Sequence, residues 1–183
     1  MNYRVRKALE ADSRAITDVI MAAFGNDEGE LISQLVTDLQ ADPTAQPPLS
    51  LVATADNSVV GHILFTSACI RHLDRKVSSS LLAPLAVHPE CQGLGIGGQL
   101  INEGLRQLGE GDTQLVFVLG HPDYYPRYGF SPAGTRGLDA PYPILPENAD
   151  AWMVQELQPG VIGSVSGQLV CAETFAAPAL WQE

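Results

Sequence analysis

A cluster of glycines lies near the middle of the 183-residue chain, between an apolar stretch and a helical pattern. The four glycines within six residues are Gly93, Gly95, Gly97 and Gly98. Glycine loses more backbone entropy on folding than other residues, so such a cluster needs a reason. The usual reason is close approach of backbone N–H groups to an anion at a helix N-terminus. No acidic residue lies between Glu90 and Glu103, which favours a phosphate-bearing ligand over the alternative, a plain tight turn.

Two familiar phosphate-binding loops fit this cluster poorly. A Walker A loop needs Lys and then Ser or Thr after its last glycine, but Gln99 follows Gly98. The letters also match the GxGxxG fingerprint, which would indicate an NAD-binding oxidoreductase. In that fold the strand leads almost directly into the first glycine. Here five residues separate Val87 from Gly93, so the oxidoreductase is the less favoured enzyme.

The surrounding patterns predict a mixed order of strands and helices. Helices are expected from Asp12 to about Phe24, from about Glu28 to Leu39, and directly after the glycine cluster. Strands are expected at Tyr3–Ala8, Leu49–Ala55, Val59–Ile70, Leu81–Val87, Leu115–Leu119, Ala151–Leu157 and Gln168–Phe175. The turn residues 56–58 predict that the second and third of these strands form a hairpin. This order is typical of an α/β (α+β) fold whose central sheet is covered by helices.

The stretch from Gln92 to Gly97 resembles the Q/R-x-x-G-x-G/A signature of the GNAT N-acetyltransferase superfamily. Downstream, the segment 125–130 is similar to the family's Y-x-x-x-G-F element. The segment 84–89, together with Tyr124 and Tyr125, also resembles a bacterial subgroup of predicted acetyltransferases of unassigned substrate. The resemblance covers nearly the whole chain. It implies one N-acetyltransferase domain over residues 1–183, with about six or seven strands, flanking helices, and a fourth and fifth strand that splay apart.

The resemblance further implies acetyl-CoA as co-substrate and no metal. The cofactor would lie on the strand residues Leu85, Ala86 and Val87. Its pyrophosphate would bind the loop residues Gln92, Gly93, Leu94, Gly95, Ile96, Gly97 and Gly98. Pro84 cannot donate to a sheet ladder, so it marks either the broken ladder beside the cofactor or simply the start of a strand.

In such a family a primary amine attacks the thioester directly, within a ternary complex. The backbone N–H near Leu85 would stabilise the oxyanion. Tyr125 is the candidate acid for the departing thiolate, because a phenol pKa of about 10 is close to a thiol pKa of about 8.5. The alternative for Tyr125 is a packing role in an aromatic turn. A non-catalytic acyl-CoA-binding sensor is the other alternative for the whole chain.

The general base is poorly determined by the sequence. Glu28 is our candidate, because it lies between the first two helices, where the family builds its acceptor wall. A solvated acidic helix start is the alternative for Glu28, and the sequence favours it. His88 has a near-neutral pKa suited to proton transfer, but its place beside the loop favours a structural role. His62 and His121 carry no better case.

The charge of the chain is strongly acidic, with 10 Lys and Arg against 21 Asp and Glu, a net charge of −11. This argues against nucleic acid and anionic membranes as partners. The excess lies in residues 1–70 and 137–183, whereas 71–136 is balanced. The acidic segments are those expected to frame the acceptor. We therefore hypothesise a cationic amine, small molecule or peptide, although solubilising charge is an equal explanation.

Three scattered cysteines, Cys69, Cys91 and Cys171, form no CxxC pair, so neither a disulfide framework nor a structural zinc site is expected. The apolar runs are shorter than the about 20 residues that a membrane span needs. We expect a soluble, cytoplasmic protein, and the family resemblance makes a monomer or homodimer the sensible expectation.

Overall fold

The computed structural model describes residues 3–71 and 74–182. Residues 1–2, 72–73 and 183, which include both ends of the predicted domain, lie outside the described residues. The described strands are β1 (Tyr3–Lys7), β2 (Leu49–Ala55), β3 (Ser58–Ile70), β4 (Ser78–Val87), β5 (Leu115–Leu119), β6 (Ser131–Pro132), β7 (Leu138–Asp139), β8 (Trp152–Glu156) and β9 (Gly167–Val170). They form one sheet along the path β1-β2-β3-β4-β5-β8-β6, with β9 paired to β3 and β7 paired to β9. Six strands of this path, β1 to β5 and β8, lie at predicted positions, and the last predicted strand is β9, which pairs with β3 beside the path. The short strands β6 and β7 were not predicted from the sequence.

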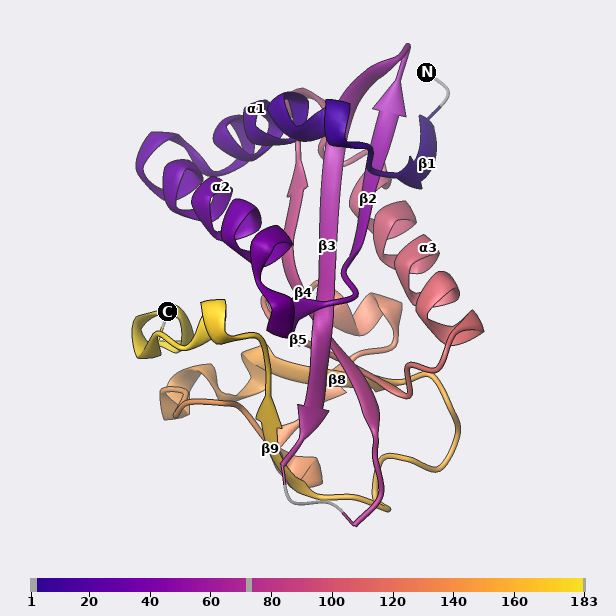
Figure 1. Ribbon diagram of the computed structural model, residues 1–183, viewed down its shortest axis with the longest axis vertical. Coiled ribbons are helices and arrows are strands. Elements are labelled where there is room, and N and C mark those ends of the chain that lie inside the picture. Colours follow the sequence, from indigo (N-terminus) through magenta and orange to yellow (C-terminus); the bar gives the residue numbers. More distant parts are fainter. Residues whose placement is uncertain (1–2, 72–73, 183) are drawn as a thin grey trace.

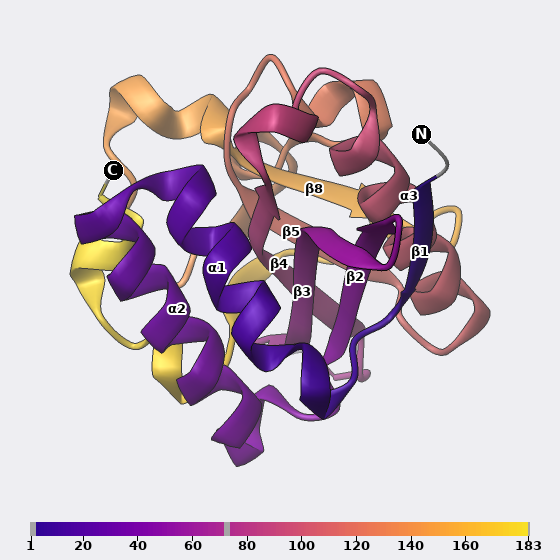
Figure 2. The same cartoon turned by 90° about the horizontal axis from the view of Figure 1, so that it is seen from above.

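Three helices cover the two faces of the sheet: α1 (Ser13–Phe24), α2 (Asn26–Ala41) and α3 (Ile96–Glu110). Helices α1 and α2 lie on one face and α3 on the other, as Figures 1 and 2 show. In α1, Ile16, Val19 and Ile20 are buried at helical spacing against the sheet. The sequence patterns predicted all three helices, and the result is a mixed α/β fold.

The hairpin between β2 and β3 forms where the turn residues predicted it. Asp56 and Asn57 both have positive φ values, 48° and 66°. Two consecutive left-handed residues are typical of the two-residue turn whose twist matches antiparallel strands. The strands β1 to β4 then continue as an antiparallel sheet.

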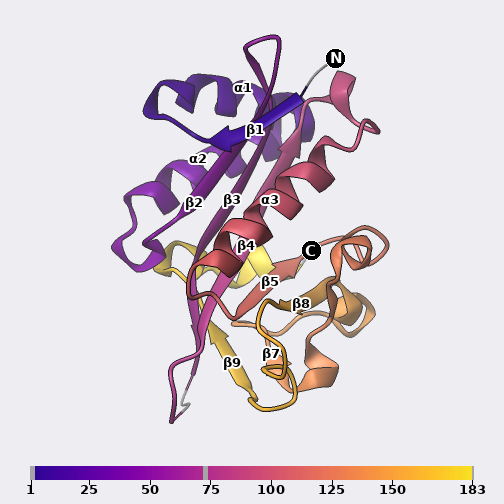
Figure 3. The same cartoon turned by 90° about the vertical axis from the view of Figure 1, so that its right-hand side faces the viewer.

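Strands β4 and β5 are parallel and separate partway along their length. Their ladder joins residues 79–82 to residues 115–118 and goes no further, so residues 85–87 of β4 pair only with β3. The register between β3 and β4 shifts at Leu64, where two residues of β4, Ala83 and Pro84, lie opposite this single residue of β3. Pro84 therefore lies at a bulge inside the strand, not at its start. The predicted splay of the fourth and fifth strands is present (Figure 3).

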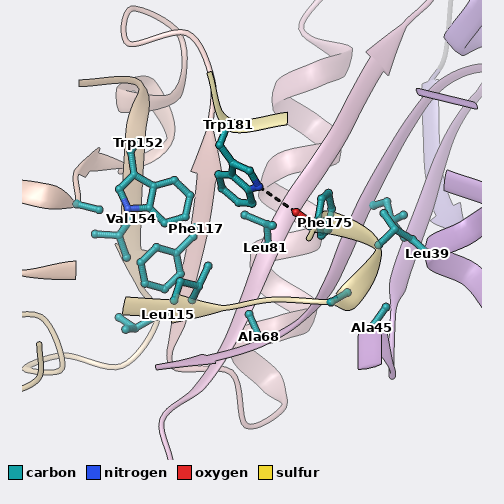
Figure 4. Packing of buried hydrophobic residues seen from close by; sticks show 14 of the residues in the cluster. Leu39, Ala45, Ala68, Leu81, Leu115, Phe117, Trp152, Val154, Phe175 and Trp181 are labelled. Carbon is teal, nitrogen blue, oxygen red and sulfur yellow. Dashed lines mark hydrogen bonds between the residues drawn. The ribbon is translucent and has the colours of Figure 1, made fainter. Parts of the chain in front are cut away.

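The C-terminal segment packs back onto the sheet through aromatic rings. The ring of Phe117 stacks on that of Trp152, with centroids 5.3 Å apart, and Trp181 meets Trp152 edge-on at 5.7 Å. Trp181 Nε1 donates a hydrogen bond to the carbonyl oxygen of Phe175 at 3.1 Å (Figure 4). The strand predicted at Gln168–Phe175 is shorter, because after β9 the chain turns into a 3-10 helix that carries Phe175 into this cluster.

No helix in residues 3–71 and 74–182 is long and apolar enough to cross a membrane.

Candidate functional site

The free edge of β4 begins where β5 leaves it. His88 N donates to Val60 O at 2.9 Å, and Ala86 lies two residues earlier along the same antiparallel ladder. Bonded pairs alternate in such a ladder, so Ala86 uses its N–H and C=O within the sheet. Leu85 and Val87 therefore direct theirs to the opposite side, where β5 no longer runs. This edge can accept an extended chain as a further partner.

The loop after β4 is fastened by two side chains that the sequence brings near it. Gln92 Nε2 donates to Val87 O at 3.0 Å, so the loop folds back onto the end of the strand. His88 Nδ1 accepts from Glu90 N at 3.3 Å. This bond caps the short 3-10 turn 89–91 and gives His88 a structural role.

Gly93 and Gly95 give the loop its backbone shape. Their φ values are +73° and +80°, in the left-handed region that favours glycine. A Cβ atom added to either residue would have no heavy atom within 4 Å, so the space above them is open. Helix α3 starts directly after Gly95, and its first internal bond runs from Gln99 N to Gly95 O at 3.0 Å.

The start of α3 presents N–H groups that have no acceptor within the helix. These are the first three amides of the helix, at residues 96–98. With the helix dipole they form a site for an anion, and the first turn carries no acidic residue. The open, donor-lined loop fits the pyrophosphate of a CoA molecule. We call the place where β4 leaves β5 and α3 begins the β4–α3 junction.

Gly97 and Gly98 have a different function, which the sequence analysis did not find. A Cβ atom on Gly98 would lie 2.5 Å from the Tyr128 hydroxyl oxygen. A Cβ atom on Gly97 would meet the Tyr124 hydroxyl oxygen and would lie 3.7 Å from Leu85 Cδ2. Two of the four clustered glycines are therefore small because tyrosines pack on the helix start, and only their amides remain for an anion.

Tyr128 belongs to the 3-10 helix η4 (Tyr125–Tyr128), and Tyr124 is the residue that precedes it. The helix ends at Gly129 with a φ of +92°. Tyr125 is buried, and its ring contacts Gly120, the residue after β5. The ring meets Phe130 edge-on, with centroids 5.7 Å apart. Burial raises the pKa of Tyr125 above that of an ordinary phenol, so the hydroxyl is protonated at neutral pH. The same shift makes Tyr125 a weaker proton donor than an ordinary phenol.

Tyr124 is a second candidate proton donor that sequence reasoning missed. Burial, together with a side-chain hydrogen bond with Tyr128, raises the pKa of Tyr124. The guanidinium carbon of Arg127 lies 5.9 Å from the Tyr124 ring centroid. The adjacent tyrosines were the only signal in the sequence. The contact of Tyr124 with Gly97 is what brings its hydroxyl to the β4–α3 junction.

Glu28 stands apart from these groups. It is exposed in the first turn of α2, beside Asp27, and α2 covers the face opposite α3 (Figure 2). Its carboxylate makes no hydrogen bond or ion pair within the described part of the chain. Tyr125, in contrast, belongs to the core on the α3 face.

His62 is fully buried on β3, opposite Ala86. Its Nε2 lies 2.9 Å from Ser50 Oγ, and its Nδ1 is buried with no hydrogen-bond partner. Burial lowers the pKa of His62 to about 4, so the ring is neutral at pH 7. Among the described residues, no group of three or more His, Cys, Asp or Glu side chains could hold a metal ion.

Comparison with known sequences identifies relatives of similar length. The chain is 42% identical over 173 residues to the uncharacterized N-acetyltransferase YjhQ of Escherichia coli (strain K12), covering 93% of each chain. It is 30% identical over 172 residues to the uncharacterized N-acetyltransferase YhbS of the same strain, covering 93% of this chain and 97% of the relative.

Comparison with solved structures gives the same result. The GNAT family N-acetyltransferase YhbS from Escherichia coli in complex with CoA is similar at a TM-score of 0.85 and 29% identity, over 97% of this chain and 93% of that chain. A GNAT family acetyltransferase from Brucella melitensis in complex with acetyl-CoA is similar at a TM-score of 0.74 and 29% identity, over 95% of this chain and 98% of that chain. The family described as "Acetyltransferase (GNAT) domain" matches residues 4–133, and the chain therefore belongs to the GNAT acetyltransferase family.

Proposed function

We propose that the protein transfers an acetyl group from acetyl-CoA to a primary amine within a ternary complex. The observation that carries this proposal is the β4–α3 junction, where open space over Gly93 and Gly95 meets the free amides of the helix start. The CoA and acetyl-CoA in two similar structures support the same ligand. Acetyl-CoA supplies a thioester whose carbonyl carbon the amine attacks.

The residues that bind the cofactor follow from the direction of their backbone groups. The amides of the loop 92–98 bind the pyrophosphate, and the exposed edge of β4 at Leu85 and Val87 pairs with the extended arm of the cofactor. Val87 O already accepts from Gln92 Nε2, so Val87 contributes its N–H. Ala86 contributes by fixing this edge, because its own groups pair with β3. The Leu85 N–H is our candidate donor to the oxyanion, since a preorganised amide stabilises charge that develops in the transition state.

Tyr125 is our candidate acid for the thiolate. Its ring lies beside the end of β5. Burial keeps the hydroxyl protonated but also raises its pKa further above that of a thiol, so proton transfer to the thiolate is less favourable than from an ordinary phenol. Tyr124, whose hydroxyl lies nearer the start of α3, is the alternative that the geometry adds.

For the base we keep Glu28, which faces solvent at the start of α2. Glu28→Gln should lower kcat and alter the acidic limb of the pH–rate profile, because the amide cannot accept a proton at this position. Glu30→Gln is the matched control, two residues away on the same helix and also exposed. Equal rates for both variants would remove Glu28 from the mechanism.

The acceptor is a small-molecule or peptide amine, and we propose that it is cationic. The acidic excess lies in residues 1–70 and 137–183, outside the cofactor-binding middle of the chain. Such a field raises the encounter rate of a positive substrate, and added salt weakens the effect. We also propose one acetyltransferase domain over residues 1–183, a monomer or homodimer, a cytoplasmic location and no metal requirement.

The proposal is tested by ligand-induced thermal stabilisation followed by turnover. We expect acetyl-CoA and CoA, but not NAD, to raise Tm, and we expect thiol release with at least one cationic amine. A rise in Tm with NAD alone would indicate an oxidoreductase. A rise with acetyl-CoA but no thiol release across polyamines, aminoglycosides, basic peptides and amino acids would indicate a non-catalytic acyl-CoA sensor.

A further inference from the structure

A cavity of about 310 Å³ opens in the C-terminal part of the molecule, away from the glycine loop. Its lining includes Asp139 of β7, Tyr142 and Ile144 from the segment that follows, Trp152 of β8 and Gln168 of β9. We call it the C-terminal cavity. Its volume is at the lower end of the roughly 300–1,000 Å³ typical of small-molecule sites.

The walls of the C-terminal cavity are fixed by hydrogen bonds from its own side chains. Trp152 Nε1 donates to Leu138 O at 3.0 Å. Gln168 Nε2 donates to Ala140 O at 3.2 Å and to Pro141 O at 3.0 Å. These bonds hold the segment 138–142 against the sheet. Trp152 itself is supported by the aromatic cluster of the C-terminal segment (Figure 4), so the cavity exists before any ligand enters.

The side chains of the C-terminal cavity are suited to a positively charged ligand. The carboxylate of Asp139 is exposed and makes no ion pair within residues 3–71 and 74–182. Gln168 uses its amide nitrogen on the backbone, so its Oε1 is left as an acceptor. No lining residue is Lys, Arg or His. The half-buried ring of Tyr142 adds a face that attracts cations, and the sequence holds no Lys or Arg after Arg136.

The C-terminal cavity adjoins the place where Tyr125 contacts the sheet. Trp152 pairs with Leu119, the last residue of β5. The next residue, Gly120, donates its N–H to Ala151 O at 2.9 Å. The ring of Tyr125 packs against Gly120. Trp152 belongs to the core on the α1–α2 face, and Tyr125 to the core on the α3 face. The C-terminal cavity and Tyr125 therefore lie on opposite faces of the sheet, near the pair formed by Leu119 and Trp152.

We propose that the C-terminal cavity binds an organic cation, and that this cation is a non-reacting part of the acceptor. An amine that attacks a carbonyl must be neutral, so the charge held at Asp139 belongs to a second nitrogen. The acceptor class is then an amine with a further cationic nitrogen on an apolar chain or ring. The acceptor role rests on the acetyl transfer proposed above, whereas the binding of a cation does not.

Binding is measured without acetyl-CoA, through the fluorescence of Trp152 and Trp181. These are the two tryptophans of the chain, and they are in ring contact with each other. Phenethylammonium should change the emission saturably, whereas uncharged 2-phenylethanol and anionic phenylacetate should bind at least about tenfold more weakly. Asp139→Asn should weaken phenethylammonium binding about tenfold. Asp18→Asn, which removes an exposed carboxylate from α1, is the matched control and should leave binding unchanged.

Turnover separates this proposal from the proposed function. Asp139→Asn should raise KM for 1,6-diaminohexane about tenfold while KM for hexylamine and the Tm rise with acetyl-CoA stay as in the parent protein. If Asp139→Asn acetylates 1,6-diaminohexane with an unchanged KM, the assignment of the cavity is overturned and acetyl transfer stands. Equal binding of 2-phenylethanol and phenethylammonium has the same consequence. If acetyl-CoA gives no Tm rise, the proposed function fails, while the fluorescence titration still decides whether the cavity binds cations.

Discussion

The hydroxyl oxygen of Tyr124 lies against Gly97, where any larger residue would place its Cβ atom. Leu85 Cδ2 lies 3.7 Å from the same point. The end of β4 and the start of α3 therefore meet Tyr124, the residue before η4, at one position. Because the amides of the α3 start face the same region, the tyrosine contact helps to set the position of the proposed pyrophosphate site.

Gly97→Ala should destabilise the protein by about 1–3 kcal/mol, because the methyl group overlaps the Tyr124 hydroxyl. Tyr124→Phe removes that hydroxyl and should recover part of the loss. A double-mutant cycle by urea denaturation measures the coupling. Gly109→Ala, on the exposed end of the same helix, is the control and should be neutral or stabilising. Strict additivity of the two changes would contradict the contact.

Gly93 allows the charge of the loop to be tested without a steric change. Asn and Asp both tolerate a left-handed backbone, and a Cβ atom there meets no neighbour within 4 Å. Gly93→Asp should weaken CoA binding at least about tenfold more than Gly93→Asn, because its carboxylate repels the pyrophosphate. Isothermal titration with CoA measures both variants. Equal affinities would place the pyrophosphate elsewhere.

Tyr125→Phe should lower kcat about tenfold or more and leave acetyl-CoA affinity unchanged, because only proton donation to the thiolate is lost. Tyr124→Phe is the direct comparison, since both hydroxyls lie in the same turn. Single-turnover rates and acetyl-CoA titrations separate chemistry from binding. A loss confined to Tyr124→Phe would transfer the role of the acid to Tyr124.

His62 should make the protein less stable in mild acid. Its folded-state pKa of about 4 is below the ordinary value of 6.5, so the unfolded chain takes up a proton first as the pH falls. Above about pH 6.5 this histidine therefore does not change the free energy of unfolding. As the pH falls to about 4, the free energy of unfolding decreases by about 3 kcal/mol. Urea denaturation at several pH values measures this slope.

Two substitutions identify the source of that slope. His62→Gln should flatten it between pH 6.5 and 4, because the amide does not titrate. His121→Gln, at an exposed histidine, should leave it unchanged. An unchanged slope in His62→Gln would assign the acid sensitivity to carboxylates.

Local patterns in the sequence determined the elements and the position of the loop. Leu115–Leu119 is apolar at every residue, which required a strand buried on both faces. Asp56 and Asn57 supplied the turn of the hairpin, and the glycines after Val87 marked a backbone that other residues cannot adopt. These features depend on neighbours within a few residues, so they could be predicted from the sequence alone.

The tertiary structure decided how these elements meet. The ladder between β4 and β5 ends at Leu82 because a distant strand diverges, and no local pattern encodes that divergence. Gly97 needs to be small because of Tyr124, which is 27 positions later in the chain. The C-terminal cavity likewise joins Asp139 to Gln168. The sequence indicated the glycine loop and Tyr125 as candidates, but it did not indicate Tyr124, whose hydroxyl meets the start of α3 only in the folded chain. Long-range packing, whose contacts have no periodic signature, decided which candidates lie together.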